Sequence, residues 1–183
     1  SEAEHHRGTT DQQAALALPA AAFAAGSDND STPTTTETTT PCSEGMVWDA
    51  NLGQCVAPKE SSLTDDALYE AVRELAYAGR YADTLNVLAA MSDQSDDRVL
   101  TYRGFVARNT GDLEGGEAFY RAAIEANPDN LLARSYMGQG YVVEGRVDEA
   151  YAQLVEIRAR GGEGSWPARA LEAAIRTGVT TNY

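Results

Sequence analysis

Apolar residues recur every three or four positions through the second half of the chain, which is the period of one buried helix face. The most regular stretch runs from Leu131 to Gly164, where two such runs lie on either side of Gly145. Runs of the same kind lie on either side of Gly79 and Gly111. A glycine suits these turns because many helices end in a residue with positive φ. We therefore expect three successive helix–turn–helix units.

The three units share a register of small and large side chains. Small residues favour a close crossing of the two helices in a unit, and the expected facing pairs are Val72 and Thr84, Gly104 and Gly116, and Gly138 and Ala150. The first pair is the bulkiest, so the first crossing should be wider. Larger residues recur at matching places, namely Leu75, Ala107 and Tyr141 on the first helices and Leu88, Tyr120, Leu154, Met91, Ala123 and Ile157 on the second.

Polar residues mark where this array begins and ends. Thr64 can cap the first helix, and two aspartates follow it in the first turn, where the helix dipole favours negative charge. After a glycine-rich turn, Ser165 can cap a seventh helix over residues 166–176. The apolar face of that helix would cover the third unit, as the end of a helical array requires. We expect seven helices within residues 65–177.

The second and third units carry residue types at the spacing of a known repeat. The matching residues are Arg103, Gly104, Gly111, Tyr120, Ala123 and Pro128 in the second unit and Gly138, Tyr141, Gly145, Ala150, Leu154 and Ile157 in the third. This pattern resembles the tetratricopeptide repeat. The first unit matches least, and Leu68, Leu100 and Arg134 replace the tryptophan typical of the family. The resemblance implies an all-α fold, a right-handed α-solenoid of three helical hairpins with a C-terminal capping helix.

In this family the first helix of each hairpin lines a concave groove that binds a peptide or a helix. The resemblance implies that the groove residues are Tyr69, Arg73, Tyr77, Thr101, Phe105, Arg108, Asn109, Ser135, Gln139 and Val142. Aromatics and arginines are the usual binding hot spots. We expect an extended peptide of acidic or carboxylate character, with binding centred on Arg73, Phe105 and Arg108. The alternative is that Tyr69 and Phe105 pack against neighbouring first helices.

Residues 1–24 resemble a secretory signal. Ala14–Ala25 is a twelve-residue apolar stretch, too short to span a bilayer, which needs about 20 residues. Small residues on either side of Phe23 form a cleavage pattern, although the preceding segment is acidic where a signal is basic. We expect cleavage after Ala24, a periplasmic or secreted location, and no stable membrane insertion.

The segment between the signal and the helices predicts two further parts. Residues 25–41 are rich in threonine and proline and predict a disordered linker in which nothing is buried. Residues 42–58 predict a small hairpin, closed by a disulfide between Cys42 and Cys55 if the compartment is oxidising. In the first interpretation Trp48 packs this hairpin on the first helix pair.

A second interpretation concerns carbohydrate. The spacing of the cysteines around Trp48 resembles half of a peritrophin-like chitin-binding module, in which an aromatic ring stacks on sugar. This resemblance implies a cell-envelope carbohydrate-binding protein that acts through the disulfide-closed hairpin. It is the main alternative to a protein-binding function.

Charge and histidine content narrow the chemistry. The formal net charge is −14, and loss of the leader, with three acidic residues and one arginine, leaves −12. This acidity argues against binding to nucleic acid or anionic lipid. The only histidines are His5 and His6, so a mature chain would lack histidine for catalysis or metal binding. We expect an exported interaction module or scaffold with no cofactor and no enzymatic activity. Self-association through the first helix or the capping helix is a further alternative.

Overall fold

The computed structural model describes residues 32–181 of the 183-residue chain, and seven helices dominate this part. They are α1 (Asp65–Tyr77), α2 (Tyr81–Leu88), α3 (Asp97–Asn109), α4 (Leu113–Ala126), α5 (Leu131–Val143), α6 (Val147–Ala159) and α7 (Trp166–Thr177). Strands β1 (Val47–Asp49) and β2 (Gln54–Val56) and the short 3-10 turn η2 (Pro58–Glu60) precede them. The predicted mainly helical fold is confirmed. The predicted signal, residues 1–24, and the first part of the linker lie outside the described residues.

Local signals in the sequence account for the helix ends. Thr64 and Ser165 both act as N-caps, since the side chain of each accepts a hydrogen bond from the backbone N–H three residues later. The turn glycines Gly79, Gly111 and Gly145 have φ angles of 74°, 98° and 75°, which side chains disfavour. These predicted caps and turns are confirmed.

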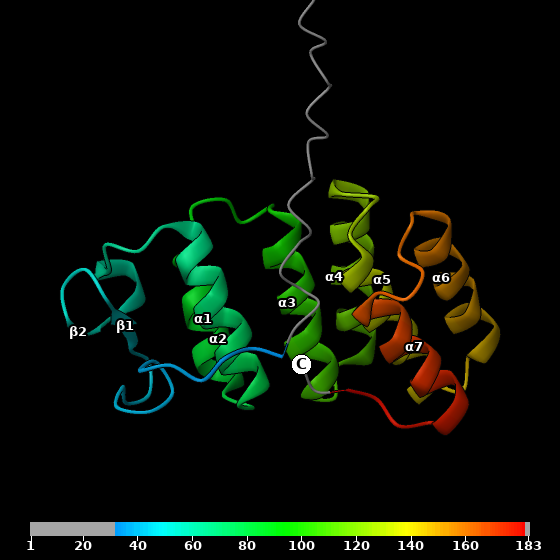
Figure 1. Cartoon of the computed structure of the whole chain (residues 1–183), viewed down its shortest axis with the longest axis horizontal. Coiled ribbons are helices and arrows are strands. Elements are labelled where there is room, and N and C mark those ends of the chain that lie inside the picture. Colours follow the sequence, from blue (N-terminus) through cyan, green and yellow to red (C-terminus); the bar gives the residue numbers. More distant parts are fainter. Residues whose placement is uncertain (1–31, 182–183) are drawn as a thin grey trace, which may run out of the picture.

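The helices pack in consecutive pairs, in a repeat-like arrangement (Figure 1). Helix α1 packs against α2, α3 against α4, and α5 against α6. The first helices of the pairs are also neighbours, because α3 contacts both α1 and α5. Helix α7 packs against α5 and α6 and so covers the last pair.

Glycines permit two close approaches between helices. A Cβ at Gly104 would lie 2.7 Å from Cε1 of Tyr120 and 3.1 Å from the carbonyl oxygen of Gly116, so the predicted facing of the two glycines is confirmed. At Gly138, the three atoms nearest to such a Cβ all belong to Leu171 of α7, rather than to the predicted partner on α6. The small residue at position 138 therefore makes room for the last helix.

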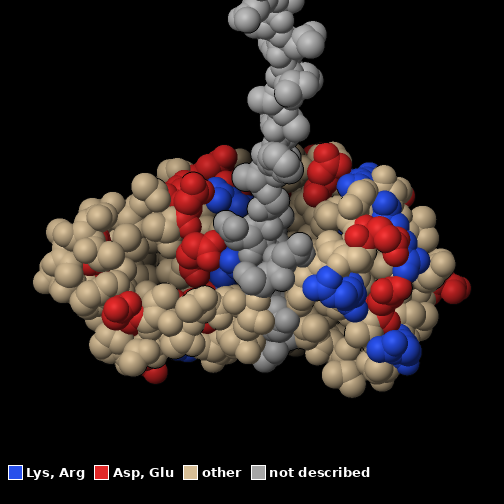
Figure 2. All heavy atoms as spheres, in the orientation of Figure 1, with Lys and Arg blue, Asp and Glu red and all other residues tan. Residues whose placement is uncertain are grey.

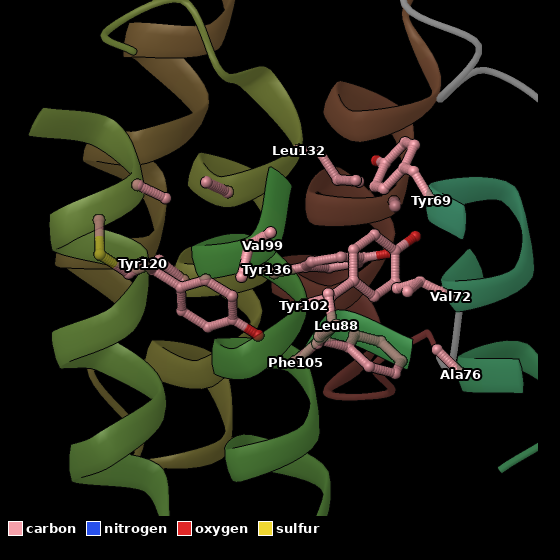
Figure 3. Close-up of a cluster of buried hydrophobic side chains, with 14 of the residues drawn as sticks. Tyr69, Val72, Ala76, Leu88, Val99, Tyr102, Phe105, Tyr120, Leu132 and Tyr136 are labelled. Atoms are coloured by element: carbon pink, nitrogen blue, oxygen red, sulfur yellow. The ribbon is translucent and has the colours of Figure 1, made fainter. Parts of the chain in front are cut away.

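A row of aromatic rings crosses the core (Figure 3). Tyr69 of α1 lies edge-on to Tyr102 of α3, with ring centroids 5.7 Å apart, and Tyr102 lies 6.3 Å from Tyr136 of α5. The ring of Tyr136 also lies 4.9 Å from Phe105 and 6.3 Å from Trp166 of α7. Aromatic pairs of this kind contribute about 0.5–1.5 kcal/mol beyond the area that they bury. The row therefore joins α1, α3, α5 and α7.

The predicted disulfide-closed hairpin is present before η2. Cys42 and Cys55 form a disulfide, and β1 pairs antiparallel with β2. Val47 is fully buried and belongs to the main hydrophobic core, whereas Trp48 is half-buried. Val47 thus anchors the hairpin on the helices, together with the backbone of Gly45, which hydrogen-bonds to Asp83 and Asn86 of α2.

Part of the predicted disordered linker lies against α1. Thr36 donates hydrogen bonds from its N–H and its hydroxyl to the carboxylate of Glu74, at 2.7 and 2.6 Å. Thr39 donates from the same two groups to the same carboxylate. Thr38 is only 4% exposed, so the prediction that nothing in residues 25–41 is buried is wrong. The physical reason is that Glu74 is itself buried and needs hydrogen-bond donors, which this segment supplies.

Candidate functional site

A groove of about 570 Å³ opens between the N-terminal parts of α1 and α3 and the turn before α5. We call it the α1–α3 groove, and it is lined by Asp66, Ala67, Tyr69, Glu70, Asp97, Arg98, Thr101, Asn127, Asp129, Asn130 and Leu132. Segments that are distant in sequence meet here because the first helices of successive pairs lie side by side. Figure 2 shows acidic and basic side chains close together in the region of α1 and α3.

The charged lining of this groove is mainly acidic. Four carboxylates line it, whereas Arg98 is its single guanidinium. Arg98 donates to Asp66 at 2.8 Å and to Asp96 at 3.0 Å, and hydrogen bonding to Asp96 raises its pKa further above the usual range. It also lies over the ring of Tyr69, 5.0 Å from the centroid. The positive charge of Arg98 is therefore already matched by carboxylates.

Hydrogen bonds fix the floor of the groove. The side-chain amides of Asn127 and Asn130 both donate to Oδ2 of Asp97, at 2.9 and 2.7 Å. The Asn130 amide also donates to the hydroxyl of Thr101 at 3.0 Å, while its oxygen accepts from Ala133 and caps α5. The turn before α5 is thereby tied to the first turn of α3.

The rim of the groove is more accessible to solvent. The side chains of Asp66, Glu70 and Asp129 are 87%, 55% and 83% exposed. Each lies within 4 Å of an arginine nitrogen; the pairs of Asp66 and Asp129 are partly exposed and contribute only about 0–1 kcal/mol each, whereas the partner of Glu70 is the buried Arg73. Asp66 and Asp129 can therefore exchange their arginine partners for a cation on another molecule at little cost.

Most of the groove residues predicted from the repeat register are buried. Two of them, Tyr69 and Thr101, line the α1–α3 groove. The buried members of the predicted set are Tyr69, Arg73, Thr101, Phe105, Arg108, Ser135 and Gln139; Asn109 and Val142 are half-buried, and Tyr77 is 38% exposed.

Phe105 occupies a groove position in the repeat register but is not exposed. Its side chain is fully buried, with Tyr81, Tyr102 and Tyr136 around its ring. A partner therefore has no surface of Phe105 to contact in this structure. The alternative expectation, that Phe105 and Tyr69 pack against neighbouring first helices, describes what is observed.

Arg108 is also inside the molecule rather than in the groove. Its guanidinium carbon lies 5.7 Å from the ring centroids of both Phe105 and Tyr136. Two of its nitrogens, Nε and Nη2, are buried without a hydrogen-bond partner among residues 32–181. Burial raises the pKa of the neighbouring Tyr120 to about 12, while the charge of Arg108 opposes that shift. Arg108 thus forms part of the packing between α3 and α5.

Sequence reasoning missed the acidic lining. The sequence pattern assigns the aspartates after Thr64 only a favourable interaction with the helix dipole, and it gives Asp97, Asn127 and Asn130 no role in binding. A signal was present, because Asp66 and Asp97 both lie in the first turn of a first helix and Asn130 caps the next one. Helices stacked in register bring such first-turn residues to one end of the array.

A second groove, of about 730 Å³, lies between α1, the hairpin and residues 32–38. Trp48 lines it together with Leu63, Ala71 and Glu74. The half-buried ring of Trp48 therefore borders a hollow next to α1 rather than being covered by the helices. This is the one feature that bears on the carbohydrate alternative.

Within residues 32–181, no group of three His, Cys, Asp or Glu side chains is arranged to hold a metal ion. No helix in the same part of the chain is both long and apolar enough to cross a membrane. Comparison of the chain with protein-family models, with curated proteins and with solved structures finds no match.

Proposed function

We propose that this protein is an exported, tetratricopeptide-like scaffold that binds an extended basic segment of another protein in the α1–α3 groove. The helices would form a right-handed α-solenoid of three hairpins, with α7 as its cap. The arrangement of the first helices as neighbours supports this reading, as do the positive-φ turn glycines. A disulfide supports export, because disulfides persist mainly in oxidising compartments.

One observation carries the basic character of the partner: the α1–α3 groove is lined by four carboxylates and one arginine that is already paired. A lysine or arginine side chain of a partner would gain from these carboxylates, and a carboxylate would be repelled. The sequence-based expectation of an acidic peptide rested on Arg73 and Arg108. Neither residue lines this groove, so we replace that expectation.

The test compares two labelled peptides of equal length, one alternating lysine and serine and the other glutamate and serine, by fluorescence anisotropy. We expect the lysine peptide to bind at least about tenfold more tightly at low salt, and its affinity to fall as salt rises. Equal binding of the two peptides would contradict the proposal.

A matched pair of variants locates the binding surface. Glu70→Gln with Asp129→Asn removes two exposed carboxylates of the groove, and should weaken the lysine peptide by about threefold or more. Glu114→Gln with Asp148→Asn makes the same change in net charge at exposed positions in the first turns of α4 and α6, which do not line the groove. An equal loss in the two double variants would show that binding follows net charge rather than the groove.

A carbohydrate-binding function is the second candidate, because Trp48 borders the second groove. Its test is a titration with soluble chitin oligosaccharides, monitored by tryptophan fluorescence in the wild type and in Trp48→Phe. A change in the wild type that is absent from the variant would favour this candidate. Unchanged tryptophan fluorescence in the wild type would reject the carbohydrate candidate, and the scaffold proposal would remain.

A further inference from the structure

The segment that follows α7 returns to α5 and hydrogen-bonds to a buried amide. Gly178 ends α7 with a φ of 73° and turns the chain back. Thr181 then donates its backbone N–H and its hydroxyl to Oε1 of Gln139, at 2.8 and 3.0 Å. The two residues are 42 positions apart in the sequence, so this contact belongs to the tertiary structure.

We propose that Ser135 and Gln139 of α5 form a recognition site for an extended segment that presents the N–H and hydroxyl of a threonine or serine. In this structure residues 179–181 occupy that site. The proposal goes beyond the function proposed above, because it concerns residues that do not line the α1–α3 groove and a different ligand chemistry.

The acceptor side of this site is prearranged. Gln139 and Ser135 are both fully buried, and Nε2 of Gln139 donates to the hydroxyl of Ser135 at 3.3 Å. This bond orients the amide so that Oε1 is available to an incoming donor pair. A buried amide oxygen left without donors costs about 1–3 kcal/mol, which makes occupation of the site favourable.

Residues 179–181, which occupy the site, are held less firmly than Ser135 and Gln139. Thr180 and Thr181 are half-buried, and Val179 is 70% exposed. The segment therefore buries little apolar surface, and the two hydrogen bonds to Gln139 contribute about 0.5–1.5 kcal/mol each. A rigid acceptor with a weakly held occupant is suited to exchange with a chemically similar segment.

The same mode of contact recurs at the other end of the array. Thr36 and Thr39 each donate an N–H and a hydroxyl to the buried carboxylate of Glu74 on α1. Two separate segments of this chain thus use threonine donor pairs to bind a buried acceptor on a first helix. The Glu74 contact provides an internal reference that changes at position 181 should leave intact.

The experiment follows the side-chain amide resonance of Gln139 by NMR in the full chain. Thr181→Pro removes both donors, and Thr181→Val removes the hydroxyl alone. We expect a clear shift of the resonance in the first variant, a smaller one in the second, and none in the control Thr180→Val. An unchanged resonance in Thr181→Pro would overturn the assignment of residues 179–181 as the occupant.

Addition of the C-terminal segment as a free peptide tests the site on α5 itself. A peptide with the sequence of residues 178–183, acetylated and amidated at its ends, is added to the Thr181→Pro chain. Because it must replace a segment held at an effective concentration in the millimolar range, it is added to about 5 mM. We expect the resonance to return toward its wild-type position, and failure to return would overturn the site. Binding of the lysine peptide to the α1–α3 groove should be equal in the wild type and in Thr181→Pro, so failure of either proposal is recognised separately.

Discussion

Gly138 of α5 lies directly beneath Leu171 of α7, so that a Cβ on the glycine would be 2.7 Å from Cδ1 of the leucine. Leu171 is fully buried at this contact. A glycine of the third helix pair therefore makes room for α7.

This contact predicts opposite effects at two glycines on one helix. Gly138→Ala should destabilise the protein by about 1–3 kcal/mol, because the buried Leu171 must move to accommodate the methyl group. Gly140→Ala should stabilise it by about 0.5–1 kcal/mol, since its Cβ would lie 3.6 Å from Cδ of Arg108, an ordinary contact, and alanine favours helix. Urea unfolding followed by circular dichroism measures both changes. Equal effects of the two substitutions would refute the close approach.

A carboxylate that joins two helix pairs predicts a pH dependence. Arg146 donates to Glu117 at 2.8 Å, and Arg121 and Tyr141 donate to the same carboxylate. The hydrogen bond from Arg146 is the main reason that the pKa of Glu117 is lowered from 4.5 to about 2. Because the pKa is lower in the folded state, the stabilisation is complete above about pH 4.5 and is lost as the pH falls toward 2.

Glu117→Gln should therefore reduce the free energy of unfolding by about 1–2 kcal/mol at pH 6 and by much less at pH 2.5. Unfolding curves of the wild type and the variant across this range check the prediction. Glu125→Gln, an exposed position on the same helix, should show no such convergence. A gap between wild type and Glu117→Gln that stays constant with pH would contradict the assignment.

The disulfide should stabilise the hairpin and the residues that lead into it. Cys42 and Cys55 are 13 positions apart, and a bridge of roughly this span contributes about 3 kcal/mol in the chain-entropy model. The Cys42→Ser, Cys55→Ser double variant should lower the melting temperature, with the first losses of hydrogen-exchange protection in residues 47–56. Reductant should lower the melting temperature of the wild type and leave that of the double variant unchanged. A reductant effect in both would point to another cause.

The buried carboxylate of Glu74 should hold residues 32–41 in an ordered conformation against α1. Glu74→Gln replaces one acceptor oxygen with a donor group that opposes the N–H and hydroxyl donors of Thr36 and Thr39. We expect about 1–3 kcal/mol of destabilisation and faster amide exchange at these threonines. Glu70→Gln makes the same change at an exposed position on α1 and should leave their exchange rates unaltered. Slow exchange that persists in Glu74→Gln would show that other contacts hold the segment.

Sequence reasoning succeeded where the cause is local. A helix cap such as Thr64 acts on backbone groups within one turn, and a turn glycine such as Gly111 is required by its own φ angle. Periodic apolar positions such as Leu154 and Ile157 are buried because an amphipathic helix buries its apolar face, whichever element packs against it. These features need no knowledge of distant residues.

The candidate site was harder to predict because exposure depends on neighbours from other helix pairs. Phe105 occupies a first-helix position in the expected register, yet Tyr136 from the next pair lies against its ring and removes it from the surface. The acidic groove arises where α1, α3 and the turn before α5 converge, and no local pattern states how close they come.

By itself, therefore, the sequence determined seven helices, their caps and turns, the hairpin and the pair of cysteines that closes it. Only the tertiary structure decided that Gly138 receives Leu171, that Glu74 orders part of the linker, and that carboxylates rather than arginines line the groove. The physical reason is that backbone geometry and capping act over a few residues, whereas burial and electrostatic surroundings are set by side chains that folding brings together from distant parts of the chain.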